Sequence, residues 1–352
     1  MLRDQTDDTY DMVVLDSAKL SDFNKETIRS YRNRHQILKS GHPFEGYTDE
    51  EYLEAIGAAA EDNDGTLRPT AAGMLMFGNE FRIIRHFPEY FLDYREVLDP
   101  TIRWTDRLQS SSGEWSGNLC DFYFRVYNKI QKDIKVPFDM VGGDRIDDTP
   151  VHKALREALA NCLVNTDFFG KYGVLVKKEP NLLILENPGY IRVGKKQMIH
   201  GGKSDPRNKV LLKMFNMINI GERSGSGVPN ILQTWDRENW VEPVVEETFG
   251  PDRTVLTLSF VDRTTQGTTQ ATQGITQANT STNSEGVVYN LQAIELSIIN
   301  LFKKHPDYSQ VKAAMELGID PNLLKYYVRK LRKRDLITRE GTSQKGRWIV
   351  KI

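Results

Sequence analysis

A single file of polar side chains runs along one predicted helix near the middle of the chain. In the stretch REALANCLVN (156–165), Glu157, Asn161 and Asn165 recur at every fourth position and so share one helix face. Apolar residues stand beside them, as in a helix that is mostly buried. A buried carboxylate or amide costs free energy unless another group pairs with it. The file therefore predicts either side chains that satisfy one another in the core or side chains that line a pocket and bind a ligand.

Two glycine-rich segments offer a different chemistry, the binding of anions. GERSGSGV (221–228) precedes a predicted helix, and Gly225 and Gly227 allow a ligand to approach the N–H groups at the positive end of that helix. HGGKSDP (200–206) ends like a Walker A motif, which also requires a glycine at position 197, where this chain has Gln. We therefore do not predict a Walker A site, although such a loop can still bind phosphate through its backbone amides.

A third cluster is cationic and lies near the end of the chain. The predicted helix PNLLKYYVRKLRKRD (321–335) carries six Lys and Arg side chains, which repel one another unless a polyanion is near. Double-stranded DNA is the predicted partner, and the alternatives are a solvated charged face or a surface that docks protein. The predicted base-edge contacts are Asn322, Lys325, Tyr326 and Arg329, with further DNA contacts from Lys330, Arg332 and Lys333 and from Lys345 and Arg347 in the following hairpin.

The elements around this cluster predict a winged helix. A helix over 291–305, a helix-turn-helix over 309–335 and two strands over 336–340 and 347–352 follow in the order of that fold. Winged-helix regulators usually pair on two half-sites, so we also expect a homodimer.

Ahead of this module, helical and strand patterns alternate. Two strands joined through 179–181 fill residues 173–189, and another strand covers 253–260. This interleaving predicts an α/β (α+β) fold in which helices pack on one face of a mixed sheet. The predicted helices lie at 150–166, 208–219 and 227–238, and the front third is an α+β region with helices at 24–34, 48–60, 70–77 and 119–134 and a strand at 89–97.

Charge and composition separate the two parts. Residues 287–352 contain 13 Lys and Arg and 6 Asp and Glu, which gives them a net charge of +7. Because the whole chain has a net charge of −1, the remainder has a net charge of −8. Between the parts, residues 264–282 contain eight Thr, four Gln and no charge, which predicts a linker. Their Thr-Gln pairs are spaced 4, 3 and 4 residues apart, so a helical or self-associating segment is the alternative.

Cysteine usage and hydropathy indicate the compartment. Cys120 and Cys162 have neither disulfide-framework nor metal-site spacing, and no apolar run approaches the length of a membrane span. The first residues also lack the apolar core of a signal peptide. We therefore expect a cytoplasmic protein.

Four motifs, taken in order, resemble the GHKL, or Bergerat-fold, nucleotide-binding superfamily and more closely the RecG-like family of transcriptional regulators. They are ALREALANCLVNTDFFG (154–170), LILENPGYI (183–191), GGKSDPRNKVLLKMF (201–215) and GERSGSGVPNI (221–231). Members are often labelled as relatives of ATP-dependent helicases and typically end in a Thr-Gln linker and a winged helix, so the resemblance covers roughly residues 150–352. It implies a helix-on-sheet sandwich that binds ATP, or another adenine nucleotide, together with Mg²⁺.

The resemblance also predicts the domain organisation. Members usually carry an N-terminal Schlafen-type, Alba-like domain ahead of the point where this chain starts, so we expect a longer parent protein. The predicted parts are an N-terminal α+β region (1–140), a GHKL-like domain (141–262), a Thr/Gln-rich linker (263–286) and a winged helix (287–352).

Roles for individual residues follow from the same resemblance. Asn161 matches the Mg²⁺ ligand, and Glu157 stands where hydrolysing members keep a general base. Asn187 falls near an aspartate that reads the adenine amino group, and Gly189 lets the base lie close. The other implied cofactor-binding residues are Asn165 beside the metal position, Gly225 and Gly227 of the second glycine box, Arg223, Ser224 and Ser226 near the phosphates, and Arg207. Arg207 and Asn208 belong to a PRN element that matches a family feature, and the sequence does not show the role of that element.

Two departures from the family pattern bear on catalysis. Residues 165–167 read Asn-Thr-Asp where the family commonly has His-Arg-Asp, and residues 187–189 read Asn-Pro-Gly where it has Asp-x-Gly. An amide can still bind adenine, but it both donates and accepts and so discriminates less than a carboxylate. We therefore expect a nucleotide-responsive DNA-binding regulator with at most weak ATPase activity. The alternatives are a winged-helix regulator whose GHKL-like domain is only a scaffold, and an ATPase or RecG-related helicase-like enzyme.

Overall fold

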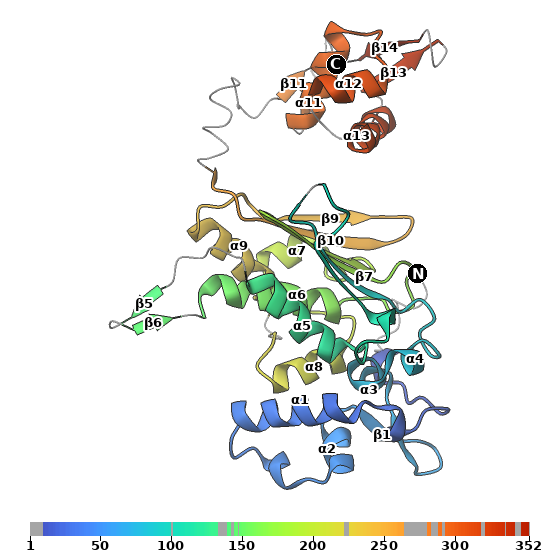
Figure 1. Cartoon of the computed structure of the whole chain (residues 1–352), viewed down its shortest axis with the longest axis vertical. Helices are drawn as coiled ribbons and strands as arrows, with labels where there is room; N and C mark the ends of the chain where they lie inside the picture. Colours follow the sequence, from blue (N-terminus) through green and yellow to red (C-terminus); the bar gives the residue numbers. More distant parts are fainter. Residues whose placement is uncertain are drawn as a thin grey trace. The chain divides into compact units, whose positions relative to one another are not determined.

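The computed structural model divides the chain into two compact units, residues 1–266 and 267–352 (Figure 1). We describe each unit by itself. The structure describes residues 10–99, 101–132, 139–141, 144–146, 148–221, 225–263, 280–282, 288–290, 293–317, 321–334, 336–341 and 346–351.

A six-stranded mixed sheet forms the centre of the first unit. Its strand order is β4-β3-β7-β8-β10-β9, and every neighbouring pair is antiparallel except β3 and β7, which are parallel. The predicted mixed sheet is therefore confirmed. The strands are β3 (Leu92–Glu96), β4 (Asp106–Gln109), β7 (Val174–Glu179), β8 (Leu182–Pro188), β9 (Val244–Thr248) and β10 (Arg253–Ser259).

Helices cover one side of this sheet in Figure 1, as the sequence predicts. The strand residues that alternate into the core are apolar on β7 and β8, for example Val174, Val176 and Leu185. α6 meets them with Leu155 and Leu159, which have no exposed surface. The helices of this layer are α5 (Leu119–Gln131), α6 (Pro150–Val164), α7 (Lys195–His200) and α9 (Gly227–Arg237). α8 (Lys209–Met217) packs against α6 on the side away from the sheet.

The N-terminal region packs against the same core. Asp11, in the short 3₁₀ turn η2 (Tyr10–Met12), accepts hydrogen bonds from the N–H groups of Val210 (2.7 Å) and Leu211 (3.0 Å) and so caps α8. β3 and β4 also come from this region, so one continuous sheet crosses the domain boundary predicted near residue 140. The remaining elements are α1 (Lys25–Leu38), α2 (Asp49–Ile56), β1 (Ala59–Glu61), β2 (Leu67–Pro69), α3 (Ala71–Phe77), α4 (Glu80–Ile83), β5 (Asp139–Val141) and β6 (Asp144–Ile146).

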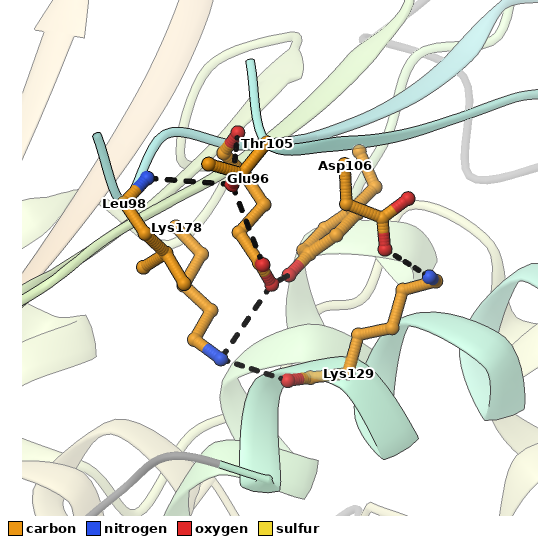
Figure 2. Close-up of polar contacts among 7 residues, drawn as sticks. Glu96, Leu98, Thr105, Asp106, Lys129 and Lys178 are labelled. Carbon is orange, nitrogen blue, oxygen red and sulfur yellow. Dashed lines mark hydrogen bonds and ion pairs between the residues drawn. The ribbon is translucent and has the colours of Figure 1, made fainter. Parts of the chain in front are cut away.

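A buried lysine joins the end of α5 to the sheet. Lys178 of β7, 5% exposed, donates to the Lys129 carbonyl (2.9 Å) in the last turn of α5, and its Nζ lies 3.7 Å from the Glu96 carboxylate (Figure 2). Tyr94 also donates to Glu96 (2.7 Å). The last carbonyls of a helix lack partners within the helix and form its negative end. The ammonium therefore satisfies an orphan carbonyl and a carboxylate at once.

The second unit is a winged helix with its own core. α11 (Ala293–Lys304), α12 (Gln310–Leu317) and α13 (Pro321–Lys333) precede the antiparallel strands β13 (Ile337–Glu340) and β14 (Arg347–Val350). Their order confirms the predicted module. Phe302 stacks on Trp348 with ring centroids 4.5 Å apart, and the surrounding core is Ile298, Ile299, Leu324, Val328, Leu331, Leu336 and Ile337.

Part of the predicted linker forms a short ladder. β11 (Thr280–Thr282) pairs antiparallel with β12 (Val288–Asn290). Residues 264–279, which include all four Thr-Gln pairs, lie outside the described residues, and so does the alternative of a helical segment.

Candidate nucleotide pocket and DNA-binding face

The polar file lies where the sequence places it, on one face of α6. Pro150 occupies the first turn of the helix, where its missing N–H costs nothing. Leu155, Leu159 and Leu163 fill the core and fix the rotation of the helix. Glu157, Asn161 and Asn165 consequently share another face, where each is half-buried.

A cavity of about 140 Å³ opens beside this face. α6 forms one wall, β8 and β10 form the floor, and the loop before α8 and the start of α9 close the other side. The predicted site residues that line it are Glu157, Asn161, Asn165, Asn187, Gly225 and Gly227. The structure thus brings together six predicted residues that come from three separate motifs.

Hydrogen bonds within the file hold two amides in place. Asn161 Nδ2 donates to Glu157 Oε1 (3.1 Å), and Asn165 Nδ2 donates to the Asn161 carbonyl (2.9 Å). The backbone N–H of Arg207 donates to Asn165 Oδ1 (3.4 Å). Asn161 Oδ1 accepts no hydrogen bond from any residue that the structure describes. The side chains of the file therefore form some of their hydrogen bonds with one another, and one amide oxygen, Asn161 Oδ1, remains as an acceptor at the cavity.

Gly227 sets the distance between α9 and the file. A Cβ at this position would lie 2.2 Å from Glu157 Oε1 and 2.9 Å from Asn161 Nδ2, so a larger residue would have to displace the ends of both side chains. The first turn of α9 therefore points its free N–H groups and positive dipole end toward the carboxylate and the cavity.

Gly225 brings the HGGKSDP loop to the same place. Its φ is +70°, and a Cβ would lie 2.6 Å from the Lys203 carbonyl oxygen. This backbone-to-backbone contact holds Lys203 and Ser204 at the rim, where both line the cavity. The loop is no Walker A motif by its sequence, but it does place an exposed ammonium at the pocket.

The turn at the end of β8 orients a second amide. Asn187 is 5% exposed, and its Nδ2 donates to the Pro188 carbonyl (3.0 Å) and the Asn165 carbonyl (3.5 Å). Gly189 follows with a φ of +100°, and Thr254 donates to its carbonyl (2.9 Å). No described residue donates a hydrogen bond to Asn187 Oδ1, so the amide offers an acceptor to the cavity.

The PRN element supports the pocket from behind. Arg207 donates to the Tyr190 carbonyl (3.3 Å), and its guanidinium lies 5.4 Å from the centre of the Tyr190 ring. It packs against Gly189 and is not among the residues that line the cavity. Asn208 donates to the carbonyls of Val164 and Thr166, both at 2.8 Å, and so holds the end of α6. Sequence reasoning gave this element no structural role.

Further cavity residues escaped sequence reasoning. Arg192 and Asp205 form an ion pair (2.9 Å) across the pocket edge, which joins the loop after β8 to the HGGKSDP loop. Nothing in their spacing signals the contact. Cys162 also lines the cavity, and burial raises the pKa of its thiol to about 12, so it remains protonated. Arg223 and Ser224 lie outside the described residues, and Ser226 is not among the residues that line the cavity.

The cationic face of α13 is separate from the core of its unit. Leu324, Val328 and Leu331 are buried, whereas Lys325 and Arg329 are exposed. Arg332, Arg334 and the wing residue Arg347 are exposed as well. The side chains of Asn322, Tyr326, Lys330, Lys333 and Lys345 lie outside the described residues.

Comparisons with known proteins match these two functional parts. Residues 174–258 match the family model described as "Putative ATP-dependent DNA helicase recG C-terminal", and residues 291–338 match the one described as "Winged helix-turn-helix DNA-binding". The chain has the domain order of the RecG-like regulators. Its N-terminal residues 1–93 match a domain of unknown function, DUF8451. The RecG-like resemblance of the sequence is thereby confirmed.

A solved structure shares the fold of this chain. The DIP2311 protein from Corynebacterium diphtheriae aligns with a TM-score of 0.55 and 16% identity over 99% of the chain. This chain spans 65% of the length of that protein. A comparison with curated proteins finds no match.

Two searches of the described residues add limits. No helix among them is long and apolar enough to cross a membrane. They also contain no group of three or more His, Cys, Asp or Glu side chains that could hold a metal ion.

Proposed function

We propose that this RecG-like chain is a nucleotide-responsive DNA-binding transcriptional regulator. ATP with Mg²⁺ binds in the cavity beside α6 and alters how the winged helix engages double-stranded DNA. The observation that carries the proposal is the convergence of Asn161, Asn187 and the Gly225–Gly227 turn on one cavity. Three motifs far apart in sequence supply these groups to one cavity.

The phosphate end of the nucleotide lies toward α9. The helix N-terminus, the glycine turn and the Lys203 ammonium all favour an anion at this rim. Mg²⁺ keeps several water ligands and takes the rest from phosphate and one or two protein oxygens. The free Oδ1 of Asn161 fits such an ion, which would screen the charge between the phosphates and Glu157.

The base lies toward Asn187. Because Nδ2 of this side chain is committed to two backbone carbonyls, the amide presents only its oxygen, as a carboxylate would. An oxygen acceptor pairs with the exocyclic amino group of adenine and opposes the carbonyl group that guanine has at the same position. The locked amide thus restores the selectivity that the missing aspartate would provide.

Hydrolysis is slow in this proposal. Glu157 accepts a hydrogen bond from Asn161 and faces the crowded start of α9, which leaves little room to position an attacking water. Nucleotide therefore acts as an allosteric ligand, and DNA must in turn change nucleotide affinity by the same factor.

Isothermal titration calorimetry of the full chain with ATP and Mg²⁺ tests the pocket. Asn161→Ala is expected to weaken binding at least tenfold, whereas Asn128→Ala, an exposed amide on α5, leaves it unchanged. A wild-type protein that shows no binding at millimolar ATP would contradict the proposal and favour a domain that serves only as a scaffold. Equal affinities of wild type and Asn161→Ala would remove Asn161 from the site.

A further inference from the structure

A second cavity, of about 270 Å³, lies in the first unit away from the nucleotide pocket. Its walls come from the segment after α1 and from one face of α8, and the two helices lie side by side in Figure 1. The lining residues are Lys39, His42, Lys209, Leu212, Lys213, Asn216 and Met217. None of them lines the nucleotide pocket or is among the predicted nucleotide-binding residues.

The ionisable side chains that line this cavity are all basic. Three lysines and a histidine line it, and no Asp or Glu does. Among the described residues, Lys39 and Lys209 form no ion pair, and Lys213 donates only to the Ala55 carbonyl (2.8 Å). Like charges held at such a site repel one another. The concentration of cations is the more unusual because the part of the chain outside the winged helix has a net charge of −8.

The groups behind the cavity experience the same positive field. His35, 2% exposed, packs edge-on against the ring of His42 with centroids 4.8 Å apart. Burial lowers the pKa of His35 most, and the charges of His42 and Lys39 lower it further, while Glu45 raises it. Burial also lowers the pKa of Lys213, with no carboxylate acting against it.

We propose that this cavity binds a phosphate group, either as a small phosphorylated molecule or as a phosphodiester of nucleic acid. Lys209 and Lys213 stand one turn apart on α8 and present their ammonium groups from one side, and Lys39 faces them from the other. Lysine binds phosphate as a mobile point charge, which suits an open cavity of this size. Leu212, Asn216 and Met217 complete the lining and add no negative charge.

Thermal unfolding of the full chain with inorganic phosphate, at constant ionic strength set by chloride, tests the site. Phosphate is expected to raise the melting temperature of the wild type and of Lys39→Arg/Lys209→Arg. The rise should be clearly smaller for Lys39→Gln/Lys209→Gln, because only one of the three ammonium groups then remains, and any rise that persists comes from the pocket beside α6. The control Lys19→Gln/Lys25→Gln removes two exposed charges elsewhere in the same region and should respond as the wild type does.

Duplex DNA then distinguishes the source of the phosphate. If the site holds nucleic-acid backbone, the slope of log K against log salt should fall by about one for each phosphate that the Gln variant no longer neutralises. If it holds a small phosphorylated molecule, the slope stays the same and only the response to inorganic phosphate depends on the lysines. An equal melting response in all variants, with equal slopes, would overturn the proposal.

Discussion

At the scale of single residues, the informative positions are two asparagines whose side-chain NH2 groups are already hydrogen-bonded within the fold. Asn161 and Asn187 each donate a hydrogen bond from Nδ2 to a neighbouring group, and each leaves Oδ1 as an acceptor at the cavity. The types and spacing of the α6 file are visible in the sequence. The direction of each amide is not, because it depends on carbonyl groups that only the folded chain brings near. The Arg192–Asp205 pair is hidden as well, because only the folded chain brings the two loops together.

Base selectivity is the prediction that belongs to this scale. ATP should bind at least tenfold more tightly than GTP, because Asn187 Oδ1 attracts an amino group and repels a carbonyl oxygen. Asn187→Ala should weaken ATP binding by about fivefold and bring the two affinities close together, as measured by calorimetry.

A matched variant controls for general effects on β8. Asn181→Ala changes an exposed amide in the turn before the strand and should leave the ATP-to-GTP ratio intact. If the wild type bound GTP as tightly as ATP, the locked amide would not select the base.

At the scale of elements, the periodicity of apolar residues predicts the positions of most helices and strands. The sequence places β7, β8 and β10 and helices α6, α8 and α9 within a few residues of their observed ends. It does not identify β4 (DRLQ) or β9 (VVEET), which are edge strands of four and five residues, too short for alternation to stand out. The parallel pairing of β3 with β7 joins residues about 80 positions apart, and no local pattern encodes it.

The Lys178 contact makes an element-scale prediction. Lys178→Met should lower the free energy of unfolding by about 3 kcal/mol, because Glu96 and the last turn of α5 lose a buried cation. Thermal or urea unfolding measures this change, and the double variant Lys178→Met/Glu96→Gln should recover part of it.

The neighbouring Lys177 supplies the control. It points to the opposite face of β7, where it pairs with Glu179 and is 35% exposed. Lys177→Met should cost less than about 1 kcal/mol. An equal loss in the free energy of unfolding for both variants would show that the contact at the end of α5 does not stabilise the fold more than an exposed ion pair does.

At the scale of the whole molecule, two units fold around separate cores. The sequence indicates both, because the charge and composition change at the Thr/Gln-rich segment. It also predicts that the DNA-binding surface is on the basic second unit and the nucleotide pocket in the acidic first unit. The coupling between them is a property of neither unit alone, so neither motifs nor periodicity can establish it.

The most direct test of the central claim is the affinity of the full chain for duplex DNA, measured by fluorescence anisotropy with and without Mg²⁺-ATP. We predict that ATP changes the Kd for DNA by about fivefold or more in the wild type, in the range typical of allosteric coupling. Asn161→Ala should bind DNA as the wild type does without nucleotide and should require at least tenfold more ATP for the same response. A wild-type Kd that is the same with and without saturating ATP would contradict the account.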